Sequence, residues 1–193
     1  VRIYQCTALD WHRLQESDGA MTSFSRRSFS ALALIAAACA ATAQVERPVR
    51  LGEKLPPLEL DYIKGDKIIA PNGKNITLVE FWATWCKPCL KTIPHLTAIQ
   101  KRFEDRGLQV IGISDESRDL VDAFVHEMGA KMDYSVAVDV NRKTSNRFRE
   151  NDSPIPRAFL FNEEGTLIWI GHPADENLER LIDEVTSELQ EGS

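Results

Sequence analysis

The sequence predicts an α/β fold, with helices packed around a central mixed β-sheet, and three observations carry this prediction. A near-continuous apolar run at residues 78–83, interrupted only by Glu80, is typical of a strand buried on both faces. An amphipathic helix follows it directly, and strands and helices then alternate along the chain. The chain closes with a β-hairpin and a last amphipathic helix, which together predict antiparallel strands at one side of the sheet.

Apolar periodicity and turn residues give the individual elements in order. Gly107 and Gly129 are suited to end the two helices that precede them. Asn72-Gly73 marks a turn before the central strand. The expected elements are short strands at 58–62 and 67–69, the central strand, a helix from Cys86 to Phe103, a strand at 108–114, a helix at 119–128, a strand at 135–138, a helix at 144–149, a hairpin of 157–162 and 166–171, and a helix at 175–189.

Cys86 and Cys89 stand where the central strand gives way to the long helix. The free N–H groups and the dipole of a helix N-terminus favour a thiolate there, and the ammonium group of Lys87 adds to this effect. Pro88 fits the first helical turn, where a missing N–H costs nothing. Two intervening residues let the sulfurs meet in one ring. We therefore expect thiol–disulfide exchange, with Cys86 as nucleophile and Cys89 as resolving thiol.

A C-x-x-C pair can also be half of a zinc site or a purely structural disulfide. A zinc site needs four ligands, from a second cysteine pair or from two histidines. The chain has no second such pair, and its histidines are scattered singly: His12, His95, His126 and His172. A lone C-x-x-C between a buried strand and a helix favours the redox interpretation.

The segment FWATWCKPC resembles the active-site segment of the thioredoxin superfamily, and Pro94 matches the proline that bends the long helix of that family. The resemblance covers about residues 52–189 and is closest to the exported TlpA-like branch. It implies a thioredoxin-like three-layer sandwich in which residues 119–138 form a helix–strand insertion. It also implies a protein-disulfide oxidoreductase that needs no cofactor besides its redox-active disulfide.

The resemblance assigns further residues to the site. Ile155-Pro156 resembles the loop with a cis-proline that lies against the disulfide and pairs with substrate backbone. Arg157 departs from the threonine that thioredoxins often carry there, and it would add positive charge near the thiols. Trp82 and Trp85 are expected to supply packing and a flat docking rim.

Glu80 is the one carboxylate in the central strand. A charge buried in a strand is costly without a partner or a function, and burial should raise its pKa toward neutrality. Glu80 lies six residues before Cys86, where thioredoxins carry a buried acid. The resemblance therefore implies that Glu80 accepts the proton of Cys89 during exchange.

His172 is the expected site residue that lies farthest along the chain from the two cysteines. Counting equal lengths of strand from the hairpin turn at Glu164 places His172 opposite Pro156, and therefore beside the disulfide. An imidazolium there would favour the Cys86 thiolate. The alternative is that His172 only ends a strand at the surface. His172 also supports a rival function, in which it joins Cys86 and Cys89 as a third ligand of a copper-binding or copper-delivery protein.

The first 43 residues are expected to be processing segments and not fold. Residues 1–20 show no period and resemble an over-extended gene start. Residues 21–43 have the pattern of a signal peptide, with Arg26-Arg27, an apolar run and a small-residue cleavage site. The arginine pair fits a twin-arginine signal or an ordinary basic region. Cys39 offers a less favoured lipoprotein site.

Residues 44–193 then form one domain of ordinary size. The chain carries a formal net charge of −6, which makes nucleic acid and anionic lipid poor partners. The expected partners are client proteins with disulfides or thiols and a membrane-bound electron donor or acceptor. We expect a periplasmic or otherwise exported monomer. The sequence leaves open the direction of electron flow, although the TlpA-like resemblance favours a reductant.

Overall fold

The structure is a computed structural model, and it describes residues 47–68, 71–148 and 153–191. The expected gene-start and signal segments, including Cys39, lie outside these residues. The described strands form a six-stranded mixed sheet in the order β1-β4-β3-β2-β5-β6. The strands are β1 (Asp61–Lys64), β2 (Ile76–Phe81), β3 (Leu108–Ser114), β4 (Ser135–Val138), β5 (Arg157–Phe161) and β6 (Leu167–Gly171). The α-helices are α2 (Lys87–Phe103), α3 (Arg118–Met128), α4 (Lys143–Phe148) and α5 (Glu176–Glu191).

Strand β2 lies in the interior of the sheet, as its continuous apolar run predicts. All six of its residues are buried. It pairs in parallel with β3 on one side and antiparallel with β5 on the other. Both of its edges are therefore hydrogen-bonded, and its side chains alternate between two covered faces.

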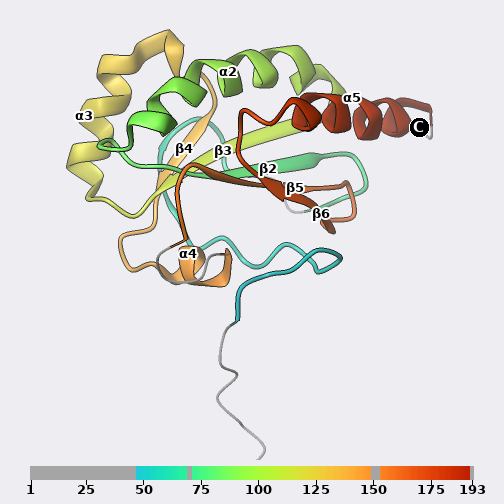
Figure 1. The fold of residues 1–193 in the computed structure, drawn as a ribbon, viewed down its shortest axis with the longest axis horizontal. Coiled ribbons are helices and arrows are strands. Elements are labelled where there is room, and N and C mark those ends of the chain that lie inside the picture. The colour runs from blue at the N-terminus through green and yellow to red at the C-terminus, as the bar shows by residue number, and fades with distance from the viewer. Residues whose placement is uncertain (1–46, 69–70, 149–152, 192–193) are drawn as a thin grey trace, which may run out of the picture. The chain divides into compact units, whose positions relative to one another are not determined.

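Helices cover both faces of the sheet, which gives the three layers that the resemblance implies. Figure 1 shows α2, α3 and α5 on one face and α4 on the other. Leu78 of β2 and Trp82, the residue after β2, belong to the hydrophobic cluster under α2. Val79 and Phe81 belong to a second cluster on the α4 face. The even-numbered positions of β2, including Glu80, thus point toward α2.

The aromatic side chains of the α4 face pack against one another, Phe148 edge to face on Phe159 and Phe161 and tilted on Phe81. Phe148 of α4 lies 5.2 Å from Phe159 and 5.9 Å from Phe161, measured between ring centroids, and Phe81 lies 5.3 Å from Phe148. Such pairs add stabilisation beyond the burial of their area. This face is a packed apolar layer, and the polar groups of interest lie on the α2 face.

Most elements lie within a residue or two of their predicted bounds. The strand at 108–114 and the strand at 135–138 are confirmed, as are the helix–strand insertion and the terminal hairpin. Phe103 ends α2, and Gly107 (φ 93°) has the left-handed conformation that a helix-terminating glycine favours.

The prediction for the first strand was wrong. The strand forms at Asp61–Lys64 and not at 58–62, because it pairs with the four-residue β4. Leu58 and Leu60 instead pack against the cluster on the α4 face. The second expected strand is also wrong over Lys67 and Ile68, which are irregular; residue 69 lies outside the described part.

In the described part of the chain, none of the helices is long and apolar enough to cross a membrane.

Candidate active site

Cys86 is the N-cap of α2, and the two cysteines form a disulfide. The backbone N–H of Cys89 lies 3.3 Å from Cys86 Sγ and donates to it, so the sulfur takes the place of the usual capping oxygen. The two sulfurs are 2.07 Å apart. Pro88 lies in the first turn, and that turn contains no acidic residue. The expected placement of a C-x-x-C pair at a helix N-terminus is confirmed.

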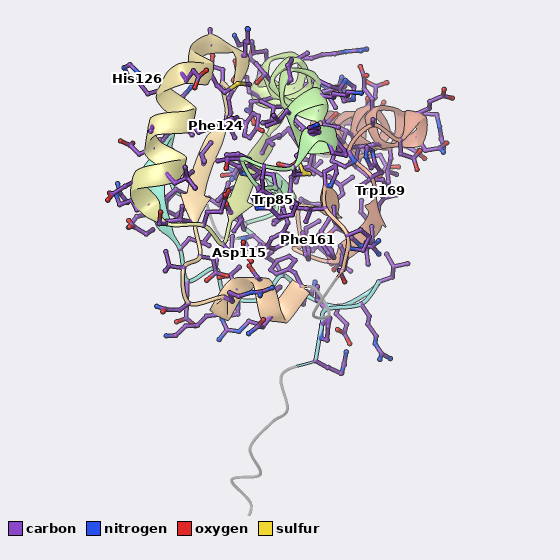
Figure 2. The ribbon with its side chains drawn as sticks, turned by 60° about the vertical axis from the view of Figure 1, so that its left-hand side comes forward. Trp85, Asp115, Phe124, His126, Phe161 and Trp169 are labelled. Atoms are coloured by element: carbon purple, nitrogen blue, oxygen red, sulfur yellow. A yellow bond between two sulfur atoms is a disulfide. The ribbon has the colours of Figure 1, made fainter. Side chains whose placement is uncertain are left out.

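The disulfide lies just below the surface. Cys86 is only 3% exposed and Cys89 is fully buried, whereas Trp85 is 70% exposed. Figure 2 shows the sulfur–sulfur bond at the start of α2, with Trp85 next to it in the chain. Lys87 and Pro88 are also exposed. The outer sulfur is thus reached over a rim of exposed residues. Trp82, in contrast, is buried and packs on Phe124 of α3.

The loop before β5 covers the outer sulfur. The Ile155–Pro156 bond is cis, as predicted, and the carbonyl oxygen of Ile155 lies 3.6 Å from Cys86 Sγ. In the disulfide this is a contact, because the sulfur carries no hydrogen. A Cys86 thiol could donate to the same oxygen. Arg157 begins β5 and pairs with Phe81 at the end of β2.

Glu80 is completely buried on the same face of β2. Neither of its carboxyl oxygens has a hydrogen-bond partner among the described residues. Burial without a partner raises the pKa of Glu80 from 4.5 to about 8. The expected direction of the shift is confirmed. A carboxyl group that titrates near neutral pH can accept or donate a proton there.

A second carboxylate, which the sequence pattern did not reveal, holds the segment between β2 and Cys86. Glu116 accepts from the Thr84 N–H at 2.7 Å and from the Thr84 hydroxyl at 2.8 Å. It also accepts from the Ser114 hydroxyl at 3.1 Å. Its position just past the carboxyl end of β3, which neighbours β2, is a signal that could have found it. Glu116 therefore fixes the approach to the N-cap.

His172 follows β6 and is exposed. Its Nδ1 accepts from the N–H of Ala174, within its own turn. The hairpin pairs Ala158 with Gly171, and a register shift at Leu160/Phe161 moves the ladder by one residue from the predicted count. If the same register continued one residue beyond Ala158 and Gly171, His172 would lie opposite Arg157 and not Pro156. No hydrogen bond or ion pair of the described residues joins His172 to either cysteine.

Metal binding needs a cluster of ligating side chains. Within the described ranges, no group of three or more His, Cys, Asp and Glu side chains could hold a metal ion. The copper alternative would need such a third ligand beside the two sulfurs.

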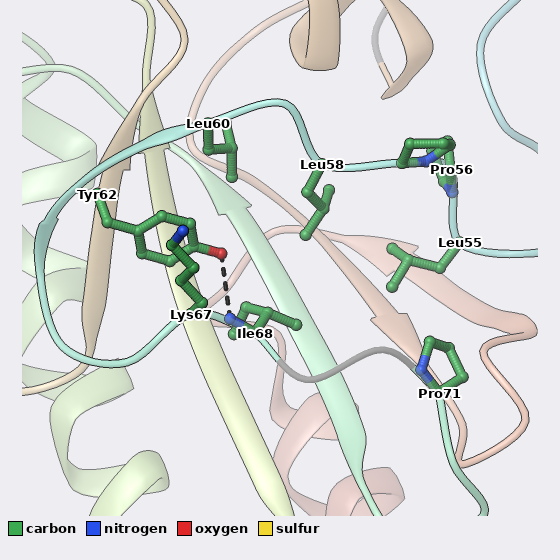
Figure 3. A pocket seen from close by; sticks show the side chains of 9 residues that line it. Leu55, Pro56, Leu58, Leu60, Tyr62, Lys67, Ile68 and Pro71 are labelled. Carbon is green, nitrogen blue, oxygen red and sulfur yellow. Dashed lines mark hydrogen bonds between the residues drawn. The ribbon is translucent and has the colours of Figure 1, made fainter.

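An apolar groove lies elsewhere in the described part of the chain. It is a groove of about 340 Å³ beside the segment that leads into β1 (Figure 3). In it the hydroxyl of Tyr62 accepts from the N–H of Ile68 at 3.1 Å. None of the predicted site residues lines this groove. It is lined by Leu55, Pro56, Pro57, Leu58, Leu60, Tyr62, Lys67, Ile68 and Pro71.

Comparison with known proteins agrees with this geometry. The profile described as the AhpC/TSA family matches residues 51–170. A relative named thiol-disulfide oxidoreductase ResA, from Bacillus thuringiensis (strain Al Hakam), is 29% identical over 143 residues, which cover 72% of this chain and 80% of ResA.

Two solved structures share the fold. A candidate protein disulfide isomerase from Bacteroides thetaiotaomicron superposes with a TM-score of 0.63 at 24% identity, over 75% of this chain and 92% of its own. A thiol-disulfide isomerase from Corynebacterium glutamicum superposes with a TM-score of 0.57 at 19% identity, over 70% and 97% respectively. These likenesses show a thioredoxin-like fold.

Proposed function

This chain belongs to the AhpC/TSA family, and from that premise we propose that it is a thiol–disulfide oxidoreductase that reduces disulfides of client proteins outside the cytoplasm. One observation carries the proposal. The Cys86–Cys89 disulfide caps a helix N-terminus directly beneath the carbonyl of Ile155. A reactive pair, a helix N-terminus that stabilises a thiolate and a backbone carbonyl that can accept from a client strand are thus adjacent.

The cycle begins with both cysteines reduced. The Cys86 thiolate, favoured by the N–H of Cys89 and the helix N-terminus, attacks one sulfur of a client disulfide and releases the other as a thiolate. Cys89 then loses its proton to Glu80 and attacks Cys86 Sγ. The second client sulfur leaves, and the Cys86–Cys89 disulfide forms. Two electrons have passed to the client.

The site around the disulfide suits a client in an extended conformation. Trp85 and Pro88 offer exposed apolar surface on one side of the sulfurs. Ile155 offers its carbonyl oxygen on the other, where a client N–H can donate to it. Arg157, at the start of β5, adds a positive charge at this end of the strand.

Export and the reducing direction are parts of the proposal that rest on the sequence. The signal pattern at 21–43 supports export, and the TlpA-like resemblance supports a reductant that is recharged by a membrane-bound donor. The name of the ResA relative supports the exchange chemistry.

The test uses the domain from residue 44 onward and two variants. Wild type should reduce insulin when it is recharged by dithiothreitol. Cys89→Ser should accumulate mixed disulfides with clients, whereas Cys86→Ser should form none, because the nucleophile is missing. Equal trapping by both variants would contradict the assigned roles.

The reduction potential of the Cys86–Cys89 couple, measured against glutathione, decides the direction of electron flow. A strongly oxidising value would overturn the reductant proposal. Tight one-to-one copper binding without insulin reduction would instead support the copper alternative.

A further inference from the structure

Three buried side chains on the α2 face carry polar atoms that have no hydrogen-bond partner among the described residues. They are the two carboxyl oxygens of Glu80, the indole Nε1 of Trp82 and the hydroxyl of Tyr134. None of these residues is more than 5% exposed. Nearly all buried polar groups in proteins are hydrogen-bonded, so several unpaired groups at one place need an explanation.

The three side chains meet over Gly112. This glycine lies opposite Glu80 in the β2–β3 ladder. A Cβ atom at Gly112 would lie 3.0 Å from Trp82 Nε1 and 3.1 Å from Tyr134 Cε2. Both rings therefore occupy the space above Gly112, where a side chain next to Glu80 would otherwise lie. Burial and then the charge of Glu80 raise the pKa of Tyr134 well above its ordinary value, which agrees with a close approach of the two groups.

The chemistry of the three groups is complementary. An ionised carboxylate only accepts hydrogen bonds, an indole N–H only donates, and a tyrosine hydroxyl does both. An internal water molecule makes two to four hydrogen bonds and can join such a set. Donors directed at a carboxylate favour its ionised form and so lower its pKa.

We propose that Tyr134 is a positioning residue for proton transfer between Cys89 and Glu80: with the Trp82 N–H, its hydroxyl holds one internal water molecule against the Glu80 carboxyl group. The inference rests on the proposed function. In the resolving step, the Cys89 S–H bond breaks and its proton goes to the Glu80 carboxylate. The Cys89 thiolate forms a bond to Cys86 Sγ, and the client sulfur leaves with the electron pair of the mixed disulfide.

Tyr134 does not carry this proton. Its hydroxyl stabilises the carboxylate that has to be present before the transfer, so it sets the pH at which Glu80 can act. Without that hydroxyl, the water molecule would lose one of its two holding groups, and the carboxylate would form only at higher pH.

Among the described residues, few other titratable side chains on the elements around Glu80 are buried. Cys86 and Cys89 lie at the start of α2, on the same face. The remaining titratable side chains of α2 and α3 are exposed, apart from the half-buried His95. Glu116, after β3, is bound to Thr84 and Ser114. The buried Asp139, after β4, accepts from the N–H of Ser145 in α4, on the opposite face.

The test is the pH dependence of the resolving step. A mixed disulfide between Cys86 and a peptide thiol is prepared, and release of the peptide is followed from pH 5 to 10. Tyr134→Phe removes only the hydroxyl. It should move the midpoint of the profile upward by about one pH unit, and so slow release about tenfold near pH 7, since the water molecule that donates to the carboxylate loses one of its partners. An unchanged midpoint would overturn the proposal.

Two further variants keep the test sharp. Tyr62→Phe is the matched control, because it also removes a tyrosine hydroxyl with one hydrogen bond, but in the apolar groove (Figure 3). Its midpoint should match wild type; an equal shift in Tyr62→Phe would assign the effect to general destabilisation.

Trp82→Phe removes the other donor and should shift the midpoint in the same direction as Tyr134→Phe. A midpoint unchanged in Trp82→Phe would remove the indole from the proposal.

A second readout separates failure of the inference from failure of the proposed function. Carbon-13 labelling of the Glu80 carboxyl follows its titration directly by NMR in the oxidised protein, with no client present. Tyr134→Phe should raise that pKa by about one unit, whether or not the protein reduces insulin. If insulin is reduced but neither readout moves, only the inference fails. If the NMR pKa moves but insulin is not reduced, the proposed function fails.

Discussion

Two carboxyl groups lie close to the segment that leads to Cys86, and they differ in burial and in hydrogen bonding. Glu80 sits inside β2, fully buried, and neither of its oxygens has a partner among the described residues. Glu116 sits in the loop after β3, half-buried, and accepts from the Thr84 N–H, the Thr84 hydroxyl and the Ser114 hydroxyl. The carboxyl group of Glu80 thus lacks a protein hydrogen-bond partner among the described residues, whereas the carboxylate of Glu116 accepts three hydrogen bonds.

The difference indicates how each carboxylate contributes. Three donors fix the Glu116 carboxylate in place, and through it they fix Thr84, two residues before the N-cap. Burial without a direct protein partner leaves the pKa of Glu80 raised toward neutral pH, which costs stability and suits proton transfer. We therefore expect Glu116 to fix the geometry of the segment before Cys86 and Glu80 to take part in proton transfer.

The largest expected effect concerns stability. The folded-state pKa of Glu80, about 8, lies above its ordinary value of 4.5, so folded protein keeps a proton that unfolded protein has lost. The contribution to stability is complete below about pH 4.5 and is lost as pH rises to 8. Relative to Glu80→Gln, the free energy of unfolding of the oxidised wild type should fall by about 1.4 kcal/mol per pH unit across this window, on the order of 5 kcal/mol in all. Urea unfolding at a series of pH values measures it, and parallel curves for the two proteins would refute it.

The next effect concerns exchange. Glu80→Gln keeps the shape of the side chain but cannot accept the Cys89 proton. Insulin reduction should slow on the order of 100-fold near neutral pH, and less at high pH, where Cys89 ionises unaided. A pH–rate profile equal to that of wild type would remove Glu80 from the chemistry and break the comparison.

Glu116→Gln should lower stability by a smaller amount and leave the pH dependence of exchange unchanged. The amide keeps one acceptor but replaces the second by a donor that faces the Thr84 hydroxyl or N–H. We expect a loss of about 1–3 kcal/mol in the free energy of unfolding, because hydrogen bonds to a charged group are lost. The midpoint of the pH–rate profile should stay in place. A moved midpoint would show that Glu116 also takes part in proton transfer.

The smallest expected effect is that of His172→Asn. His172 is exposed and bonded within its own turn, so its charge should be largely screened from the thiols. The pKa of the Cys86 thiol, followed by the pH dependence of iodoacetamide labelling, should change by less than about 0.3 unit. A clear rise of the Cys86 pKa in His172→Asn would show that the His172 imidazole does favour the thiolate, and His172 would then belong to the site with Glu80.

Local pattern predicted much of this molecule. The apolar run with one Glu, the C-x-x-C pair and the helical spacing of Leu90, Ile93 and Leu96 identified β2, the capped helix and the buried acid. These features depend on neighbours within a few residues. Burial of one side chain and the position of a cap follow from the strand or helix that contains them.

The sequence alone determined the redox pair, its helix N-terminus and a carboxyl group forced into the interior. Only the tertiary structure decided the rest. Pairing with β4 placed β1, and one shifted residue in the β5–β6 ladder moved its register away from the count that set His172 opposite Pro156. The fold also brought Tyr134, which follows α3, over Gly112 beside Glu80. Strand register and side-chain convergence depend on which segments pair across the sheet, and that choice is made by the packing of the whole core and not by any local period.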